Sequence, residues 1–129
     1  MKEMVLYYTP EQSSKVTKLK GVLVRMGIRI KNITPEQVTQ KVGYLAGVEG
    51  FEAQENDKGA VLPVIGEEVL VMHRFTSRRI DELLLNLRKA GVPRIELKAI
   101  VTESNCPWTF YQLFEELKEE HAKMQETGQ

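Results

Sequence analysis

Residues 69–102 read VLVMHRFTSRRIDELLLNLRKAGVPRIELKAIVT. They begin with an apolar run typical of a strand, continue at helical spacing as far as Ala90-Gly91, and end in a second strand pattern that closes on Thr102. The apolar residues of the middle part recur at i, i+3, i+4 and i+7 and are Ile80, Leu83, Leu84 and Leu87. This spacing predicts an amphipathic helix that lays one apolar stripe on a sheet.

Residues 5–34, VLYYTPEQSSKVTKLKGVLVRMGIRIKNIT, repeat the same plan of strand, helix, glycine, strand and threonine. Gly27 and Gly91 occupy the position where a left-handed residue closes a helix. Each repeat is followed by another helical pattern, and that of the second has Phe110, Leu113, Phe114 and Leu117 on one face. The chain is therefore predicted to consist of two β-α-β-α halves.

The 129 residues are too few for two independent cores, so we expect a single α/β domain over residues 1–129. Its first half is residues 1–45, its connector residues 46–68 and its second half residues 69–125. Two right-handed strand-helix-strand crossovers predict a four-stranded, mostly parallel sheet with helices packed on it. We expect the strand order 2-1-3-4, with the first and third strands side by side at the centre.

Two local features refine this outline. The string Thr-Pro-Glu-Gln follows a strand at Thr9 and again at Thr34, and it predicts a helix-capping turn. At Thr9 the helical pattern starts only near Val16, so there the turn is expected to precede the helix.

Within the connector, the acidic part Glu49–Lys58 is predicted to be disordered, and the apolar part Ala60–Ile65 is predicted to dock on the core or to add an edge strand.

Composition narrows the possible chemistry. The chain has 18 basic and 18 acidic residues, which excludes a uniform field that would draw it to nucleic acid or an anionic membrane. It has no apolar run long enough for a membrane span and no signal-peptide pattern. Cys106 is the only cysteine, so no intrachain disulfide can form and a cytoplasmic location is expected. His73 and His121 are the only histidines and lack a ligand motif, so neither a metal nor a cofactor is predicted.

The candidate ligand site lies at the carboxyl ends of the strands, where sheets of this class bind ligands. Hydroxyls, helix amides and arginines gather there, and they could hold a small anionic ligand or a protein partner. The residues selected are Thr9, Thr76, Ser77, Arg78, Thr102, Asn105 and Trp108. A purely structural interpretation competes: Thr76 caps a helix, Arg78 pairs with Glu82, Asn105 or Cys106 caps the last helix, and Trp108 anchors its loop on the core.

Two other functions remain as alternatives. Cys106 stands near a helix N-terminus, where a thiolate can be stabilised, so a small enzyme or redox protein could use it as a nucleophile. The segment from Lys15 to Lys31 is basic and contains no acid, which makes nucleic-acid binding a weaker alternative. The same basic segment could instead pair with the acidic tail Glu115–Glu126 of a second copy of the chain.

The second half also resembles a known family. The resemblance rests on the Lys-Ala strand Ile95–Thr102, on Asn105 and Trp108, and on a leucine-rich helix that ends in acids and His121. Over roughly Glu67–His121 this pattern is similar to a bacterial family described only as a domain of unknown function. The resemblance implies a small cytosolic bacterial protein. It implies no activity, because none is established for the family. Its matching residues make Lys98, Thr102, Asn105 and Trp108 candidates for a functional role.

Overall fold

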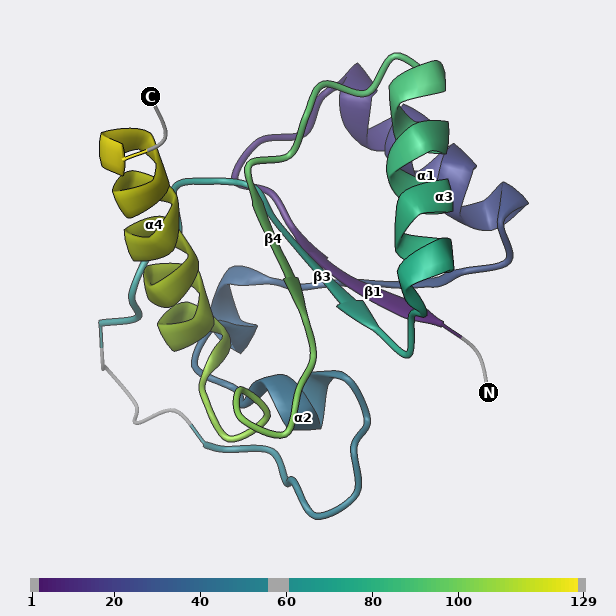
Figure 1. Ribbon diagram of the computed structural model, residues 1–129. Coiled ribbons are helices and arrows are strands. Elements are labelled where there is room, and N and C mark those ends of the chain that lie inside the picture. The colour runs from purple at the N-terminus through teal and green to yellow at the C-terminus, as the bar shows by residue number, and fades with distance from the viewer. Residues whose placement is uncertain (1–2, 56–60, 128–129) are drawn as a thin grey trace.

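The computed structural model describes residues 3–55 and 61–127 (Figure 1). Strands and helices alternate along the chain as the sequence predicts. The elements are β1 (Met4–Tyr8), α1 (Ser14–Arg25), β2 (Arg29–Asn32), the 3₁₀ turn η1 (Pro35–Gln37), α2 (Val42–Leu45), β3 (Val69–His73), α3 (Ser77–Lys89), β4 (Leu97–Ile100) and α4 (Phe110–Thr127). The second helix of the first half is thus reduced to η1 and the single turn α2.

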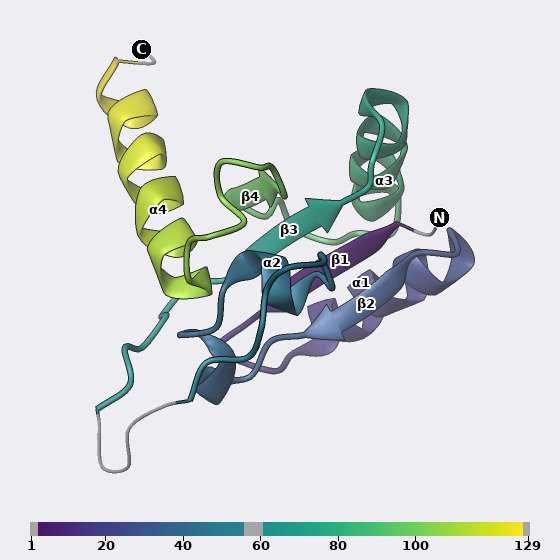
Figure 2. The same cartoon turned by 90° about the horizontal axis from the view of Figure 1, so that it is seen from below.

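The four strands form one open sheet in the order β2-β1-β3-β4, which Figure 2 shows from below. The predicted fold class and strand order are both confirmed. β1 pairs with β2 in parallel and β3 pairs with β4 in parallel. The central pair β1–β3 is antiparallel, with Met4 opposite His73 and Tyr8 opposite Val69. The two halves therefore point their carboxyl ends toward opposite ends of the sheet.

Alternation along the central strands divides the core between the two faces of the sheet. Val5 and Tyr7 of β1 pack with the apolar stripes of α1 and α3 on one face. Leu6 and Tyr8 pack with α2, α4 and the end of the connector on the other face. Figure 1 shows α1 and α3 together on one side of the sheet and α4 on the other. The chain is thus a three-layer α/β/α arrangement.

The long helices α1 and α3 end in the same backbone motif. Gly27 and Gly91 have φ of 72° and 83°, in the left-handed region that glycine adopts without steric cost. The amide of each glycine donates to the carbonyl three residues earlier, at 3.1 and 3.0 Å. The next residue, Ile28 or Val92, donates to the carbonyl five residues earlier and is buried. These are Schellman motifs, so the prediction that both glycines close a helix is confirmed.

The two Thr-Pro-Glu-Gln strings fold differently, as the sequence indicates. Thr34 begins η1 with a complete capping box, in which the Gln37 side chain accepts a hydrogen bond from the Thr34 amide at 3.0 Å. The Thr9 hydroxyl instead contacts the backbone of Glu11, and α1 begins later, at Ser14. The first string is therefore a turn before the helix.

The connector packs against the core at two places. The Phe51 ring lies so close to Gly43 of α2 that a Cβ there would come within 2.6 Å of it, and the Gln40 side chain exchanges two hydrogen bonds with the backbone of Gln54. Ile65 is fully buried, and its carbonyl accepts a hydrogen bond from Tyr8. Residues 61–65 dock through Ile65 and form no edge strand. Residues 56–60 lie outside the described residues; they include the last three residues of the segment predicted to be disordered and the first residue of the apolar part.

Candidate functional site

The predicted ligand residues do not form one rim. Because β1 and β3 are antiparallel, Thr9 follows β1 at one end of the sheet, whereas Thr76, Ser77 and Arg78 follow β3 at the other end. Thr102 follows β4, the parallel neighbour of β3, and so begins its loop at the same end as Thr76. The expectation of a single site that joins Thr9 to the other residues is therefore wrong. The sequence predicts that β1 and β3 lie side by side but does not give their relative direction, and the antiparallel direction separates Thr9 from the other residues.

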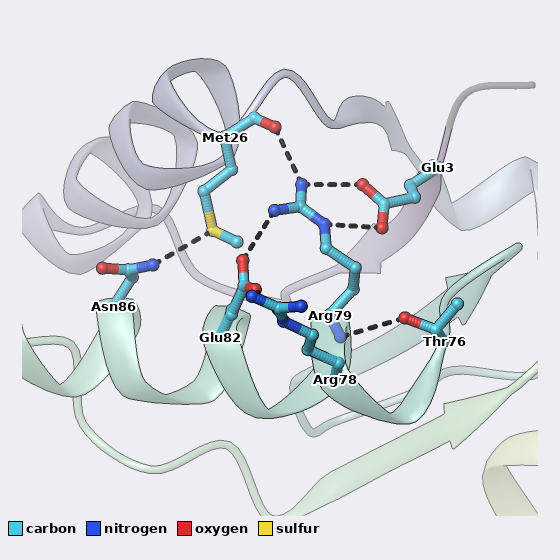
Figure 3. A network of polar contacts seen from close by, with 7 residues as sticks. All are labelled: Glu3, Met26, Thr76, Arg78, Arg79, Glu82 and Asn86. Atoms are coloured by element: carbon cyan, nitrogen blue, oxygen red, sulfur yellow. Dashed lines mark hydrogen bonds and ion pairs between the residues drawn. The ribbon is translucent and has the colours of Figure 1, made fainter.

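The start of α3 is held by contacts within the protein (Figure 3). The Thr76 hydroxyl accepts a hydrogen bond from the Arg79 amide at 3.2 Å and caps the helix. Arg78, whose side chain is 89% exposed, lies 3.4 Å from Glu82, as the structural interpretation expects. Arg79 donates to Glu3, Glu82 and the Met26 carbonyl, and the two carboxylates raise its pKa. The Thr76 hydroxyl and the Arg79 guanidinium thus already have partners within the protein.

The loop before α4 is built around Asn105, which is 7% exposed. Its side-chain oxygen accepts from the Thr102 amide and its side-chain nitrogen donates to the Ile100 carbonyl, both at 2.9 Å. The carbonyls of Cys106 and Trp108 accept hydrogen bonds from the first residues of α2. Asn105 therefore fixes the loop, and α4 is capped by Thr109, whose hydroxyl accepts from the Gln112 amide at 3.1 Å. The expected cap at Asn105 or Cys106 is wrong, because the helix begins later, at Phe110.

Cys106 lies within this loop and is only 7% exposed. Burial, and next the Glu103 carboxylate, raise the pKa of its thiol. A nucleophilic cysteine needs the opposite shift, because the thiolate is the reactive form. The surroundings of Cys106 therefore favour a packed, protonated thiol. Trp108 is half-buried against the same core, as predicted.

Thr9 borders a buried polar cluster at the carboxyl end of β1. Tyr7 is 1% exposed and its hydroxyl donates a hydrogen bond to Glu68. The other oxygen of Glu68 lies 2.5 Å from Lys15 of α1. Burial and the neighbouring carboxylate raise the pKa of Tyr7. The cluster ties α1, β1 and the end of the connector together, so Lys15 is held inside the protein's own contacts.

A groove of about 540 Å³ lies between α3 and the segment that leads into β4. It is lined by Leu84, Leu87, Arg88, Val92, Pro93, Arg94, Ile95 and Lys98. The apolar stripe of α3 extends beyond the part that packs in the core. Leu83 and Leu87 are buried, whereas Leu84 is half-buried and lines the groove. Figure 1 shows the loop that carries the chain from the end of α3 across to β4. The groove thus has an apolar floor at one edge of the sheet.

Three cations and no acid stand among the residues that line this groove: Arg88, Arg94 and Lys98. Arg94 is 78% exposed and lies 3.8 Å from Glu96, at the limit of an ion pair. The Lys98 ammonium donates a hydrogen bond to the Ile95 carbonyl, and burial, followed by the charge of Arg94, lowers its pKa. An anion placed among these side chains would relieve their mutual repulsion. The groove is therefore suited to an anionic group attached to an apolar body.

Sequence reasoning missed Arg88 and Arg94, although the resemblance pointed to Lys98. The two halves of the sequence differ in the number of residues between the glycine that closes the helix and the strand that follows it. β2 begins at Arg29, two residues after Gly27, whereas β4 begins at Leu97, six residues after Gly91. Of the additional residues in this segment, Pro93, Arg94 and Ile95 supply one wall of the groove. Comparing the two repeats for length would have indicated this site.

The comparisons with known proteins concern the half that contains the groove. Residues 68–124 match the family model of a domain of unknown function (DUF3783). The resemblance over Glu67–His121 is thereby confirmed, and all eight groove-lining residues fall inside the DUF3783 match. No curated protein and no solved structure matches the chain.

Two kinds of feature are absent from the described part of the chain. Within residues 3–55 and 61–127, no helix combines the length and the apolar character required to cross a membrane. The same residues contain no group of three or more His, Cys, Asp or Glu side chains arranged to hold a metal ion.

Proposed function

We propose that this chain is a noncatalytic binding domain whose α3–β4 groove holds a small anionic ligand with an apolar body. One observation carries the proposal: Arg88, Arg94 and Lys98 line an apolar groove whose lining residues include no acid. The repulsion among these cations is countered in part by Glu96, which lies 3.8 Å from Arg94, and a bound anion would offset the rest. The groove volume of about 540 Å³ falls within the usual range for small-molecule sites.

The composition of the groove indicates the ligand class. Leu84, which is half-buried, and Pro93, which is exposed, offer apolar surface that an alkyl chain can cover. Arg88 and Arg94 present guanidinium groups, whose planar donors suit carboxylate and phosphate oxygens. A medium-chain carboxylate or alkyl phosphate satisfies both requirements at once.

The groove has better support as the ligand site than the carboxyl-end residues do. The Thr76 hydroxyl caps α3, and Asn105 satisfies the backbone of its own loop. Ligand contacts by these two side chains would have to replace existing hydrogen bonds. Lys15, the first residue of the basic segment considered for nucleic acid, is likewise paired with Glu68.

The test is a binding titration with octyl phosphate and octanoate, using octyltrimethylammonium as the cationic control. We expect both anions to bind and the cation not to bind. The double substitution Arg88→Gln/Arg94→Gln should weaken anion binding about tenfold or more, because each lost charged contact costs on the order of 1 kcal/mol.

The matched control is Lys18→Gln/Arg25→Gln, which removes the same charge from exposed positions of α1. It should leave the affinity unchanged. Equal weakening by both double variants would show that only net charge matters and would overturn the groove as the site. Failure of both anions to bind would overturn the small-ligand function and leave a protein partner as the occupant.

A further inference from the structure

Lys98 is held at the groove wall. It is the second residue of β4, it is half-buried, and its ammonium donates a hydrogen bond to the carbonyl of Ile95. This contact fixes the amine beside Ile95, a residue that is itself 3% exposed and lines the same groove. Lys98 therefore lines the space where the ligand of the proposed function would lie.

The surroundings of Lys98 lower the pKa of its amine, so a larger fraction is neutral at a given pH than in an exposed lysine. Burial is the largest cause of its lowered pKa, and the charge of Arg94 is the second; Glu96 acts in the opposite direction. Only a neutral amine has the lone pair needed to attack a carbonyl carbon, and desolvation beside another cation is a known way to make a lysine nucleophilic. Lys98 thus combines a place in the lining of the groove with a lowered amine pKa.

We propose that Lys98 captures aliphatic 2-oxo acids in the groove as an imine. This inference rests on the proposed function and deepens it, since it names the ligand's reactive group. The carboxylate would pair with Arg88 and Arg94, the alkyl chain would cover Leu84 and Pro93, and the adjacent carbonyl would meet the Lys98 amine. A 2-oxo acid combines these three features within a few atoms.

The chemistry balances without any further reagent. The Nζ lone pair of Lys98 forms a bond to the carbonyl carbon, and the C=O π electrons move to the oxygen, which takes up a proton. The nitrogen loses a proton to solvent water and the new hydroxyl takes up a second proton. The nitrogen lone pair then expels this group as water, and loss of the last N–H proton leaves the imine, so that amine plus carbonyl gives imine plus water. No His, Asp or Glu stands among the groove-lining residues to act as a general acid or base on the product. The expected result is reversible covalent capture without turnover.

The test is reductive trapping on the full chain. The protein is incubated with 2-oxooctanoate and cyanoborohydride near neutral pH, digested, and the adduct on each lysine is measured by mass spectrometry. We expect Lys98 to be modified several-fold more than the exposed Lys89 and Lys123, and excess octanoate to suppress only the modification of Lys98. Because this comparison is made within the wild-type protein, it does not depend on the folding of any variant.

Controls separate this inference from the proposed function. 2-Hydroxyoctanoate should bind the groove but leave no adduct, and Lys98→Arg should keep the site's charge while losing the adduct. If octanoate binds and the lysines are modified equally, imine capture is overturned while the binding function stands. If octanoate does not bind and Lys98 is not modified preferentially, both are overturned.

Discussion

Arg79 of α3 donates hydrogen bonds of 2.8 Å to both carboxylate oxygens of Glu3, the residue that precedes β1. The same guanidinium donates to the Met26 carbonyl at the end of α1 and to Glu82 one turn along its own helix, both at 2.9 Å (Figure 3). One side chain of the second half thus joins two elements of the first. The pairing explains why this arginine is a structural rather than a ligand-binding residue.

Arg79→Lys should lower the melting temperature by several degrees, because an ammonium cannot reproduce the two parallel bonds to Glu3 and the bond to Met26. Arg78→Lys is the matched control, since Arg78 is highly exposed and makes only the 3.4 Å contact with Glu82. It should change the melting temperature by about one degree or less. Thermal unfolding followed by circular dichroism measures both, and equal effects would contradict the linking role of Arg79.

Asn105→Ala should destabilise the protein by about 1–3 kcal/mol, because the Thr102 amide and the Ile100 carbonyl both lose the buried side chain that bonds them. The comparison is Asn32→Ala at the exposed end of β2, which should cost about 0.5 kcal/mol or less. Urea unfolding gives both free energies. A cost for Asn105→Ala as small as that of the control would show that the loop does not depend on this side chain.

Gly91→Ala should cost about 1–2 kcal/mol, because a Cβ is strained at φ 83° although no atom lies closer than 3.7 Å to its position. Gly66→Ala introduces the same methyl group into open space without a positive φ, and it should be close to neutral. The same urea measurement distinguishes them. If the two substitutions had equal effects, the Schellman turn would not control the path of the chain toward the groove.

Cys106 should react slowly with iodoacetamide at neutral pH, more slowly than a free thiol such as glutathione. Its raised pKa leaves less thiolate at a given pH than an exposed thiol has, and burial restricts access. The rate should rise as the pH increases, because more thiolate then forms. Fast alkylation at pH 7 would restore the nucleophilic interpretation of this residue.

The strongly periodic parts of the fold are predictable from the sequence. The leucine stripe of α3 and its counterpart in α1 locate the long helices, and Gly27 and Gly91 locate their ends. The order of the strands follows from the two repeats. The relative direction of β1 and β3 does not, because the long connector between the halves allows the chain to return in either sense.

The candidate site is less predictable for the same reason. The sequence places Thr9 and Thr76 at carboxyl ends of strands, but the antiparallel pair β1–β3 sends them to opposite ends of the sheet. The groove depends on where the loop Pro93–Glu96 lies beside α3, which is a tertiary contact. Local patterns indicate caps and stripes, whereas a pocket between two elements requires their packing.

The location of the bound anion tests the central claim most directly. Backbone amide shifts of the ¹⁵N-labelled protein, recorded during titration with octyl phosphate, report the contact residue by residue. The groove predicts that the largest saturable changes fall on Leu84–Arg88 and Val92–Lys98. Changes confined to Thr76–Arg79 or Thr102–Trp108, with the groove amides unmoved, would contradict it.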